Sequence, residues 1–133
     1  MEIVVGYIPR EEGLAAVEYA TELAVRESAR LTIVNSGVHG NDSDPSFATA
    51  ADLDAISERL SRRGVEHEVR QPVRAELPAE EILQVAADVG ADLIVIGLRR
   101  RALVGKVFLG STVQQIVIEA ECPVVTVKQR RSE

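Results

Sequence analysis

Residues 78–97 read PAEEILQVAADVGADLIVIG, and this stretch indicates the fold class. Pro78 suits the first turn of a helix, and the carboxylates of Glu80 and Glu81 behind it complement the positive end of the helix dipole. Gly90 is a typical C-terminal cap. The apolar residues between them recur at helical spacing, at Ile82, Val85, Ala86 and Val89. Residues 93–96 are apolar throughout, which is typical of a strand covered on both faces.

The same alternation of helix and strand extends in both directions from this stretch. Apolar runs predict strands at residues 3–8, 31–34 and 124–127, and the alternation of polar and apolar residues at 65–71 (VEHEVRQ) predicts a strand with one solvated face or a position near the sheet edge. Helical periodicity predicts helices at residues 11–27, 46–62 and 112–120. Helical connections between buried strands favour a parallel sheet with helices on both faces. We therefore expect a single α/β domain over residues 1–133. Ligands should bind at the carboxyl ends of its strands, where the strand order switches direction.

Composition restricts the class of protein. The chain has 133 residues, a net charge of −6 and only 3% aromatic residues. These values exclude a generally basic nucleic-acid binder and argue against base stacking on aromatic platforms. The single cysteine, Cys122, can form neither an internal disulfide nor a four-ligand zinc site, which favours a reducing, cytoplasmic location. The sequence shows no apolar run of membrane-spanning length and no signal peptide at its start.

The most informative local feature is the segment of residues 98–110, which is basic in an acidic protein. It contains four cationic residues and no acid, at Arg99, Arg100, Arg101 and Lys106. The segment leads to a helix start at Gly110, Ser111 and Thr112, where free amides, hydroxyls and the helix dipole favour an anion. This arrangement predicts a phosphate site. The alternative is a basic surface loop followed by an ordinary capping box, with Ser111 as N-cap and Gln114 at the third helical position.

Other titratable residues carry weaker signals. His39 and His67 share no metal-ligand spacing with Cys122, which itself reads as a small buried hydrophobe. Three acidic residues surround a polar loop at residues 37–45, where a cation is conceivable but solvated carboxylates are the default; they are Asp42, Asp44 and Asp52. Paired carboxylates such as Glu11 and Glu12 are read as first-turn residues that stabilise a helix. We therefore predict no catalytic residue and no metal site.

Four stretches of the chain resemble the universal stress protein family, and together they extend over nearly its whole length. They are residues 3–24 (IVVGYIPREEGLAAVEYATELA), 29–36 (ARLTIVNS), 78–97 as quoted above, and 110–128 (GSTVQQIVIEAECPVVTVK). Nucleotide-binding members of the family carry G-x2-G-x9-G-[ST] after the fourth strand. Gly97, Gly110 and Ser111 match this motif, whereas Arg100 stands at its middle glycine. Arg100 either blocks the approach of the loop to phosphate or adds a charge to it.

A second departure from the family pattern lies at the end of the first strand. Many relatives have an acidic residue followed by Gly-Ser there, near the adenine. The corresponding positions in this chain are Ile8, Pro9 and Arg10. The usual carboxylate at the adenine edge is therefore missing, a change that bears on base recognition more than on phosphate binding.

The resemblance implies a fold and an assembly. The fold is flavodoxin-like (Rossmann-like), a three-layer arrangement of a five-stranded parallel sheet of order 3-2-1-4-5 with four helices. The assembly is a homodimer that pairs through the last strand, from Val124 to Val127. An apolar edge strand needs a cover, and a partner chain can provide one.

The function implied by the resemblance is a small cytoplasmic stress-response protein, a dimeric sensor that binds a nucleotide, ATP with or without Mg²⁺. The phosphates would meet Gly110, Ser111 and Thr112 beside Gly97, with Arg99 and Arg100 as charge partners. The base would lie against residues at and just beyond the ends of the first two strands, at Tyr7, Ile8, Pro9 and Ser36.

Two other functions stay open at this point. The first is an interaction protein of the same fold that binds no nucleotide. The presence of Arg100 in place of a motif glycine is consistent with this alternative. The second is a slow ATPase. Hydrolysis needs a residue that positions or activates water, and we find no convincing candidate for one near the basic segment.

Overall fold

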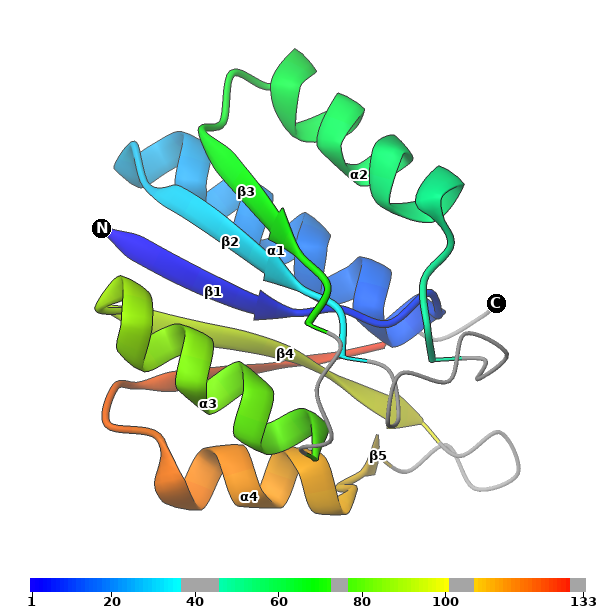
Figure 1. The fold of residues 1–133 in the computed structure, drawn as a ribbon, viewed down its shortest axis with the longest axis vertical. Coiled ribbons are helices and arrows are strands. Elements are labelled where there is room, and N and C mark those ends of the chain that lie inside the picture. The colour runs from blue at the N-terminus through cyan, green and yellow to red at the C-terminus, as the bar shows by residue number, and fades with distance from the viewer. Residues whose placement is uncertain (37–45, 73–76, 101–106, 130–133) are drawn as a thin grey trace.

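The computed structural model in Figure 1 describes residues 1–36, 46–72, 77–100 and 107–129. The loop expected at residues 37–45, with His39, Asp42 and Asp44, lies outside the described residues, as do Arg101 and Lys106. The strands are β1 (Glu2–Gly6), β2 (Arg30–Val34), β3 (His67–Arg70), β4 (Leu93–Arg100), β5 (Val107–Phe108) and β6 (Val124–Lys128). The helices are α1 (Glu11–Glu27), α2 (Ala50–Arg62), α3 (Pro78–Val89) and α4 (Ser111–Glu119).

Five parallel strands form the sheet in the order β3-β2-β1-β4-β6, which confirms the predicted order 3-2-1-4-5. β1 lies at the centre and pairs with β2 on one side and with β4 on the other, with Gly6 opposite both Val34 and Ile96. After β1 the chain adds β2 and β3 on one side of it and then returns to add β4 and β6 on the other side. The strand order therefore switches direction next to β1. Two adjacent strands that are followed by connections on opposite faces leave a crevice at their carboxyl ends.

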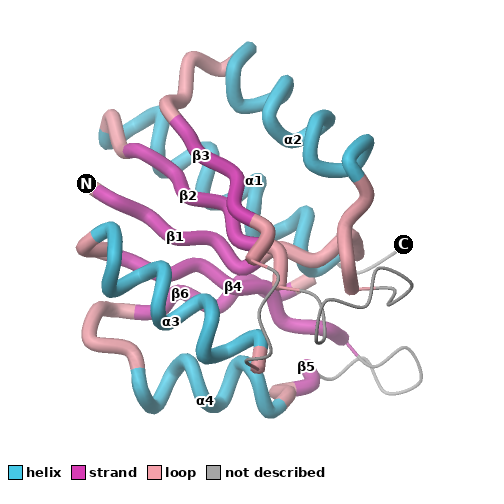
Figure 2. The backbone as a smooth tube through the Cα atoms, viewed as in Figure 1, coloured by secondary structure: helices cyan, strands magenta, loops and turns pink. Residues whose placement is uncertain are grey.

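Among the described elements, α1 and α2 cover one face of the sheet and α3 and α4 cover the other (Figure 2). One core cluster joins the sheet to α1 and α2, and a second joins it to α3 and α4. Both clusters are built almost wholly from Val, Ile, Leu and Ala. No helix in the described ranges is long and apolar enough to cross a membrane.

Several predicted boundaries are wrong by a few residues, and the capping pattern differs. β4 continues to Arg100, into the expected loop, because β5 pairs antiparallel with it and extends its ladder. The N-cap of α4 is Gly110 and makes no side-chain cap bond, so the predicted capping box at Ser111 does not form. Gln114 instead donates its side-chain amide to the carbonyl of Leu109 at 3.0 Å.

A capping box is present at α2, where we had not expected one. The Thr49 hydroxyl accepts from the amide of Asp52 at 3.1 Å, and the Asp52 carboxylate accepts from the amide of Thr49 at 2.9 Å. This pair fixes the start of the helix at Ala50, four residues after the expected start at residue 46. Asp52 is therefore occupied as a capping residue.

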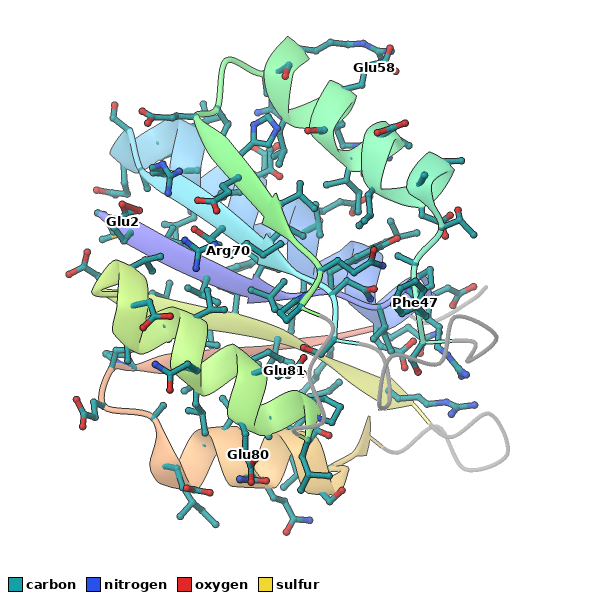
Figure 3. All side chains as sticks on the ribbon, in the orientation of Figure 1. Glu2, Phe47, Glu58, Arg70, Glu80 and Glu81 are labelled. Carbon is teal, nitrogen blue, oxygen red and sulfur yellow. The ribbon has the colours of Figure 1, made fainter. Side chains whose placement is uncertain are left out.

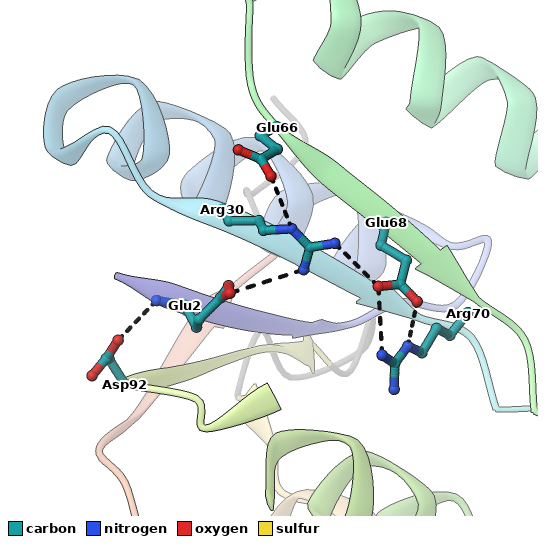
Figure 4. A network of polar contacts seen from close by, with 6 residues as sticks. All are labelled: Glu2, Arg30, Glu66, Glu68, Arg70 and Asp92. Carbon is teal, nitrogen blue, oxygen red and sulfur yellow. Dashed lines mark hydrogen bonds and ion pairs between the residues drawn. The ribbon is translucent and has the colours of Figure 1, made fainter. Parts of the chain in front are cut away.

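The α3 face of β2 and β3 carries a network of ion pairs (Figure 4). The guanidinium of Arg30 lies 3.1 Å from Glu68, 3.3 Å from Glu66 and 3.9 Å from Glu2. Arg70 also binds Glu68, at 2.6 Å. Hydrogen bonds from Arg70 and Arg30 lower the pKa of the Glu68 carboxyl. Because Glu2 and Arg30 begin their strands, this network starts at the end of the sheet opposite to the carboxyl-end crevice.

Candidate functional site

A cavity of about 500 Å³ occupies the crevice at the carboxyl ends of β1, β2 and β4. The first turns of α1, α3 and α4 close its sides. Its lining residues are Gly6, Tyr7, Ile8, Arg10, Glu12, Gly13, Val34, Ser36, Ser46, Pro78, Ile82, Ile96, Gly97, Arg99, Gly110, Ser111, Thr112 and Val113. A cavity of this size accommodates a small organic ligand.

One end of the cavity is built to receive an anion. The first hydrogen bond within α4 runs from the amide of Gln114 to the carbonyl of Gly110, at 3.0 Å. The amides of Ser111, Thr112 and Val113 therefore have no acceptor within the helix, and all three residues line the cavity. The hydroxyls of Ser111 and Thr112 add further donors. The helix dipole and these donors favour a phosphate or a carboxylate at this end.

Charged side chains flank this anion end. Arg99 projects from β4 as an exposed residue, and Arg10 precedes α1 as its N-cap residue; both line the cavity. The carboxylate of Glu12 belongs to the same cavity, and Glu12 is only 7% exposed. Two guanidinium groups against one carboxylate give the described lining a net positive charge, which suits an anionic ligand.

Close backbone packing holds the wall of the cavity next to Glu12. A β-carbon on Gly13 would lie 1.9 Å from the carbonyl oxygen of Ile8, and one on Gly97 would lie 2.0 Å from the carbonyl oxygen of Glu12. Real β-carbons never approach a carbonyl so closely, so both positions require glycine. The match of Gly97 to the family motif therefore has a packing reason: the first turn of α1 lies directly against β4.

The other end of the cavity contains a buried hydroxyl without a partner. Ser36 is 5% exposed and lines the cavity, and its hydroxyl oxygen makes no hydrogen bond within the described residues. Burying a hydroxyl without a partner is costly, whereas a polar ligand atom would supply the missing bond. The side chains of Val34, Ile82 and Ile96 form an apolar wall beside it.

Asn35 holds the segment that carries Ser36 in place. Its side-chain amide, which is fully buried, donates to the carbonyls of Tyr7 and Ser46, both at 2.9 Å. Its carbonyl oxygen accepts from the amide of Ala48 and from the side chain of Gln71, also at 2.9 Å. One side chain thus ties together the chain after β1, the segment before α2 and the end of β3. No sequence pattern marks Asn35 for this role.

Tyr7 reaches the cavity wall at the end of β1, but its ring belongs to the core beneath α1 and α2. Burial, followed by the charge of Asp52, raises the pKa of its hydroxyl. A base in the cavity would therefore rest on aliphatic side chains rather than on an aromatic ring.

Most of the residues singled out in the sequence meet in this cavity. Those that line it are Tyr7, Ile8, Ser36, Gly97, Arg99, Gly110, Ser111 and Thr112. Pro9 lies next to the wall but is not part of the lining. Arg100 pairs through its backbone with Val107 at the end of β4.

Two charged residues line the cavity although the sequence pattern assigned neither of them to the site, namely Arg10 and Glu12. The pairs Glu11–Glu12 and Glu80–Glu81 look alike in the sequence, each in the first turn of a helix. In the structure one member of each pair is exposed and the other is buried, with Glu81 only 1% exposed on the sheet side of α3. Figure 3 labels Glu80 and Glu81 and shows them on different sides of α3. Only packing against the sheet distinguishes the two members of a pair.

A second hollow, of about 510 Å³, lies between α2 and β3, with Phe47, Ser57 and Gln71 in its lining. Its described lining contains no Lys or Arg, so it offers nothing to an anion. Nearby, the ring of His67 is held by the Ser57 hydroxyl at 2.7 Å and by the carbonyl of Val65 at 2.9 Å. Cys122 lies elsewhere, beside the core under α3 and α4, and burial raises the pKa of its thiol.

Comparison with known proteins extends these observations. The profile of the universal stress protein family matches residues 1–128. A universal stress protein of Mycolicibacterium smegmatis is 38% identical over 126 residues, which cover 95% of this chain and 96% of that protein. A universal stress protein structure from Archaeoglobus fulgidus has a TM-score of 0.80 at 27% identity, covering 96% of this chain and 98% of the other.

A second structure from Archaeoglobus fulgidus, a universal stress protein in complex with dAMP, has a TM-score of 0.71. It is 23% identical and covers 96% of this chain and 98% of its own, which shows likeness of fold. The match over residues 1–128, together with the shared fold, identifies the chain as a member of the universal stress protein family.

Proposed function

We propose that the protein binds an adenine nucleotide in the cavity at the carboxyl ends of β1, β2 and β4. The observation that carries this proposal is the pairing of two features in one cavity. Free amides and hydroxyls at the start of α4 meet Arg99 at one end, and the unpartnered hydroxyl of Ser36 lies at the other. The complex of a relative with dAMP supports the same ligand class.

In the bound state the phosphates would lie at Gly110, Ser111 and Thr112, with Arg99 and Arg10 as cationic neighbours. The base would lie against Ser36 and the apolar wall. We propose ATP, with or without Mg²⁺, as the physiological ligand, because the basic residues of the segment 98–110 suit more than one phosphate. AMP serves as the smaller probe of the same cavity.

We propose that the protein acts in the cytoplasm as a dimeric sensor rather than as an enzyme. Among the described strands β6 pairs only with β4, so its other edge is available to a second copy of the chain. Two variants place a charge on this strand: Thr126→Lys, at an exposed side chain, and Val125→Lys. Both should be monomers by light scattering. An unchanged dimer in both variants would assign the contact to another surface.

Ligand binding is tested by thermal unfolding with and without 1 mM ATP or AMP. A ligand present at one hundred times its Kd stabilises the folded state by about 2.7 kcal/mol, and we expect a clear rise in Tm. Mass spectrometry of the denatured, freshly purified protein should also reveal carried nucleotide.

Substitution of the anion end links the rise in Tm to the cavity. Ser111→Ala combined with Arg99→Gln should remove most of the nucleotide-induced rise. Arg62→Gln is the matched control because Arg62 pairs with Glu58 on α2, outside the cavity. The absence of any rise in the wild type, together with the absence of carried nucleotide, would reject the proposal. Steady release of phosphate from ATP would instead indicate the slow ATPase.

A further inference from the structure

The residues that line the cavity can be ordered by the strands that carry them across the sheet. Ser36 follows β2, Glu12 lies in the first turn of the helix after β1, and Gly97 belongs to β4. Because β1 lies between β2 and β4, Glu12 stands between the unpartnered hydroxyl and the anion end. The β-carbon of Glu12 would be 3.1 Å from a β-carbon placed on Gly97, which puts its side chain at the seam of β1 and β4.

The carboxylate of Glu12 has no partner in the described part of the chain. Glu12 lines the cavity and is 7% exposed as a residue, and no hydrogen bond or ion pair from another described residue reaches its side chain. Its carboxylate oxygens are not among the fully buried, unpartnered atoms of the described residues, so they keep access to the cavity. A carboxylate that faces a cavity and has no protein partner is available to accept hydrogen bonds from a ligand that displaces water there. Exposed Glu11, its neighbour, shows that the first turn of α1 does not require a buried acid.

A nucleotide whose phosphates lie at Ser111 and whose base lies near Ser36 presents its sugar to the middle of the cavity. The vicinal hydroxyls of a ribose are two donors at the spacing that one carboxylate can accept, and acidic residues bind ribose in this way in dinucleotide-binding folds. The base offers its own donors at the other end, and the phosphates offer none.

We propose that Glu12 accepts hydrogen bonds from the ribose hydroxyls and makes the cavity selective for ribonucleotides over deoxyribonucleotides. This inference rests on the proposed function, since it places the sugar between the two ends of that site. It concerns the Glu12 of this chain alone, so the dAMP complex of a relative with 23% identity does not bear on it.

The test compares AMP, 2′-deoxy-AMP and 3′-deoxy-AMP by calorimetry on the full chain. We expect the wild type to bind AMP about tenfold more tightly than either analogue, as the loss of one hydrogen bond to a charged acceptor predicts. Glu12→Ala should remove both bonds from AMP and the one remaining bond from each analogue, so that the variant binds all three ligands within about twofold of one another. Glu11→Ala is the matched control, because it removes the same charge from the same helix turn outside the cavity.

Each other result overturns the inference in a distinguishable way. Equal binding of all three ligands by the wild type would reject ribose selection and leave the proposed function standing, whereas no binding of any ligand would reject both. Tighter binding of all three by Glu12→Ala would mean that Glu12 only repels phosphate. If the preference for AMP over the deoxy analogues disappears in EDTA, Glu12 binds a cation rather than the ribose. The wild-type comparison requires no variant, and Glu12→Gln, which keeps the side-chain volume, replaces the alanine variant if that variant unfolds.

Discussion

A β-carbon placed on Gly97 would lie 2.0 Å from the carbonyl oxygen of Glu12 and 2.6 Å from its carbonyl carbon. The two residues are far apart in the sequence, yet the first turn of α1 and the end of β4 meet here without space for a methyl group. This contact places Glu12, a residue only 7% exposed, in the cavity wall against Gly97. It also makes the wall of the cavity depend on backbone packing, which cannot adjust as the end of a side chain can.

The first prediction concerns this contact. Gly97→Ala should lower the free energy of unfolding by about 2–4 kcal/mol, because two backbone segments must separate. Gly6→Ala, in the same cavity, is the control: its nearest neighbour is the terminal methyl of Ile82 at 3.0 Å, which can rotate away. Urea unfolding measures both variants. A Gly97→Ala protein as stable as Gly6→Ala would contradict the packing at this site.

The second prediction concerns Asn35. Asn35→Asp keeps the shape of the side chain but directs a carboxylate at the carbonyls of Tyr7 and Ser46, where the amide donated two hydrogen bonds. The variant should be about 3 kcal/mol less stable at pH 7. Part of the loss should be recovered at pH 5, since a protonated acid can donate one of these bonds. Unfolding curves at the two pH values test this, and equal losses at both would refute the buried network.

The third prediction separates the charge of Arg99 from its packing. Because Arg99 is exposed and lines the cavity, Arg99→Gln should weaken AMP binding about five- to tenfold with little change in stability. The effect should shrink as salt is raised from 0.05 to about 0.5 M, since screening already weakens an exposed contact. Calorimetry at the two salt concentrations provides the measurement. An unchanged affinity at low salt would remove Arg99 from the phosphate site.

The fourth prediction follows from the ion-pair network. The pKa of Glu68 is lowered from its ordinary value of 4.5 by hydrogen bonds from Arg70 and then from Arg30. A lowered pKa in the folded state means that the ionised form stabilises the fold. This contribution is present above pH 4.5 and is lost as the pH falls through the lower folded-state pKa.

Glu68→Gln should therefore flatten the loss of stability below pH 4.5, by about 1 kcal/mol or less. The effect is small because the Glu68 side chain is 37% exposed and solvent screens its ion pairs. The control is Glu121→Gln, an exposed carboxylate outside this network. Unfolding followed between pH 3 and pH 7 tests the prediction, and parallel curves for Glu68→Gln and the wild type would contradict it.

Much of the fold is predictable from local signals. Pro78 and Gly90 bound α3 as expected, and apolar runs mark every strand of the parallel sheet except β3, whose residues alternate between polar and apolar. These signals depend on only a few neighbouring residues. They therefore predict where helices and strands lie better than where each of them ends. The end of β4 moved from residue 96 to Arg100 because β5, which no local pattern indicated, pairs with it. The cap of α4 is Gly110 rather than Ser111.

The strand order could not be obtained from periodicity. Right-handed connections allow several orders for five parallel strands, and the order 3-2-1-4-5 came from likeness to a family. The strand order also decides which residues line the same cavity. Ser36 and Gly97 face one cavity only because β1 lies between β2 and β4.

The anion end of the candidate site was visible in the sequence, because its parts are nearly contiguous: Arg99, then Gly110, Ser111 and Thr112. The opposite end was only partly visible. A hydroxyl at Ser36 is unremarkable until burial deprives it of water, and Asn35 is an ordinary polar residue until four partners surround it.

The amino-acid pattern was sufficient for the elements, the parallel sheet, the aliphatic core and the basic approach to α4, because each depends on neighbours along the chain. The position of Glu12 required the folded chain. Glu11 and Glu12 are chemically identical and adjacent, and packing of α1 against Gly97 exposes one and buries the other. Packing around Glu12 restricts the access of water to its carboxylate and leaves it open to a ligand in the cavity, and this difference arises only when distant backbone segments come together.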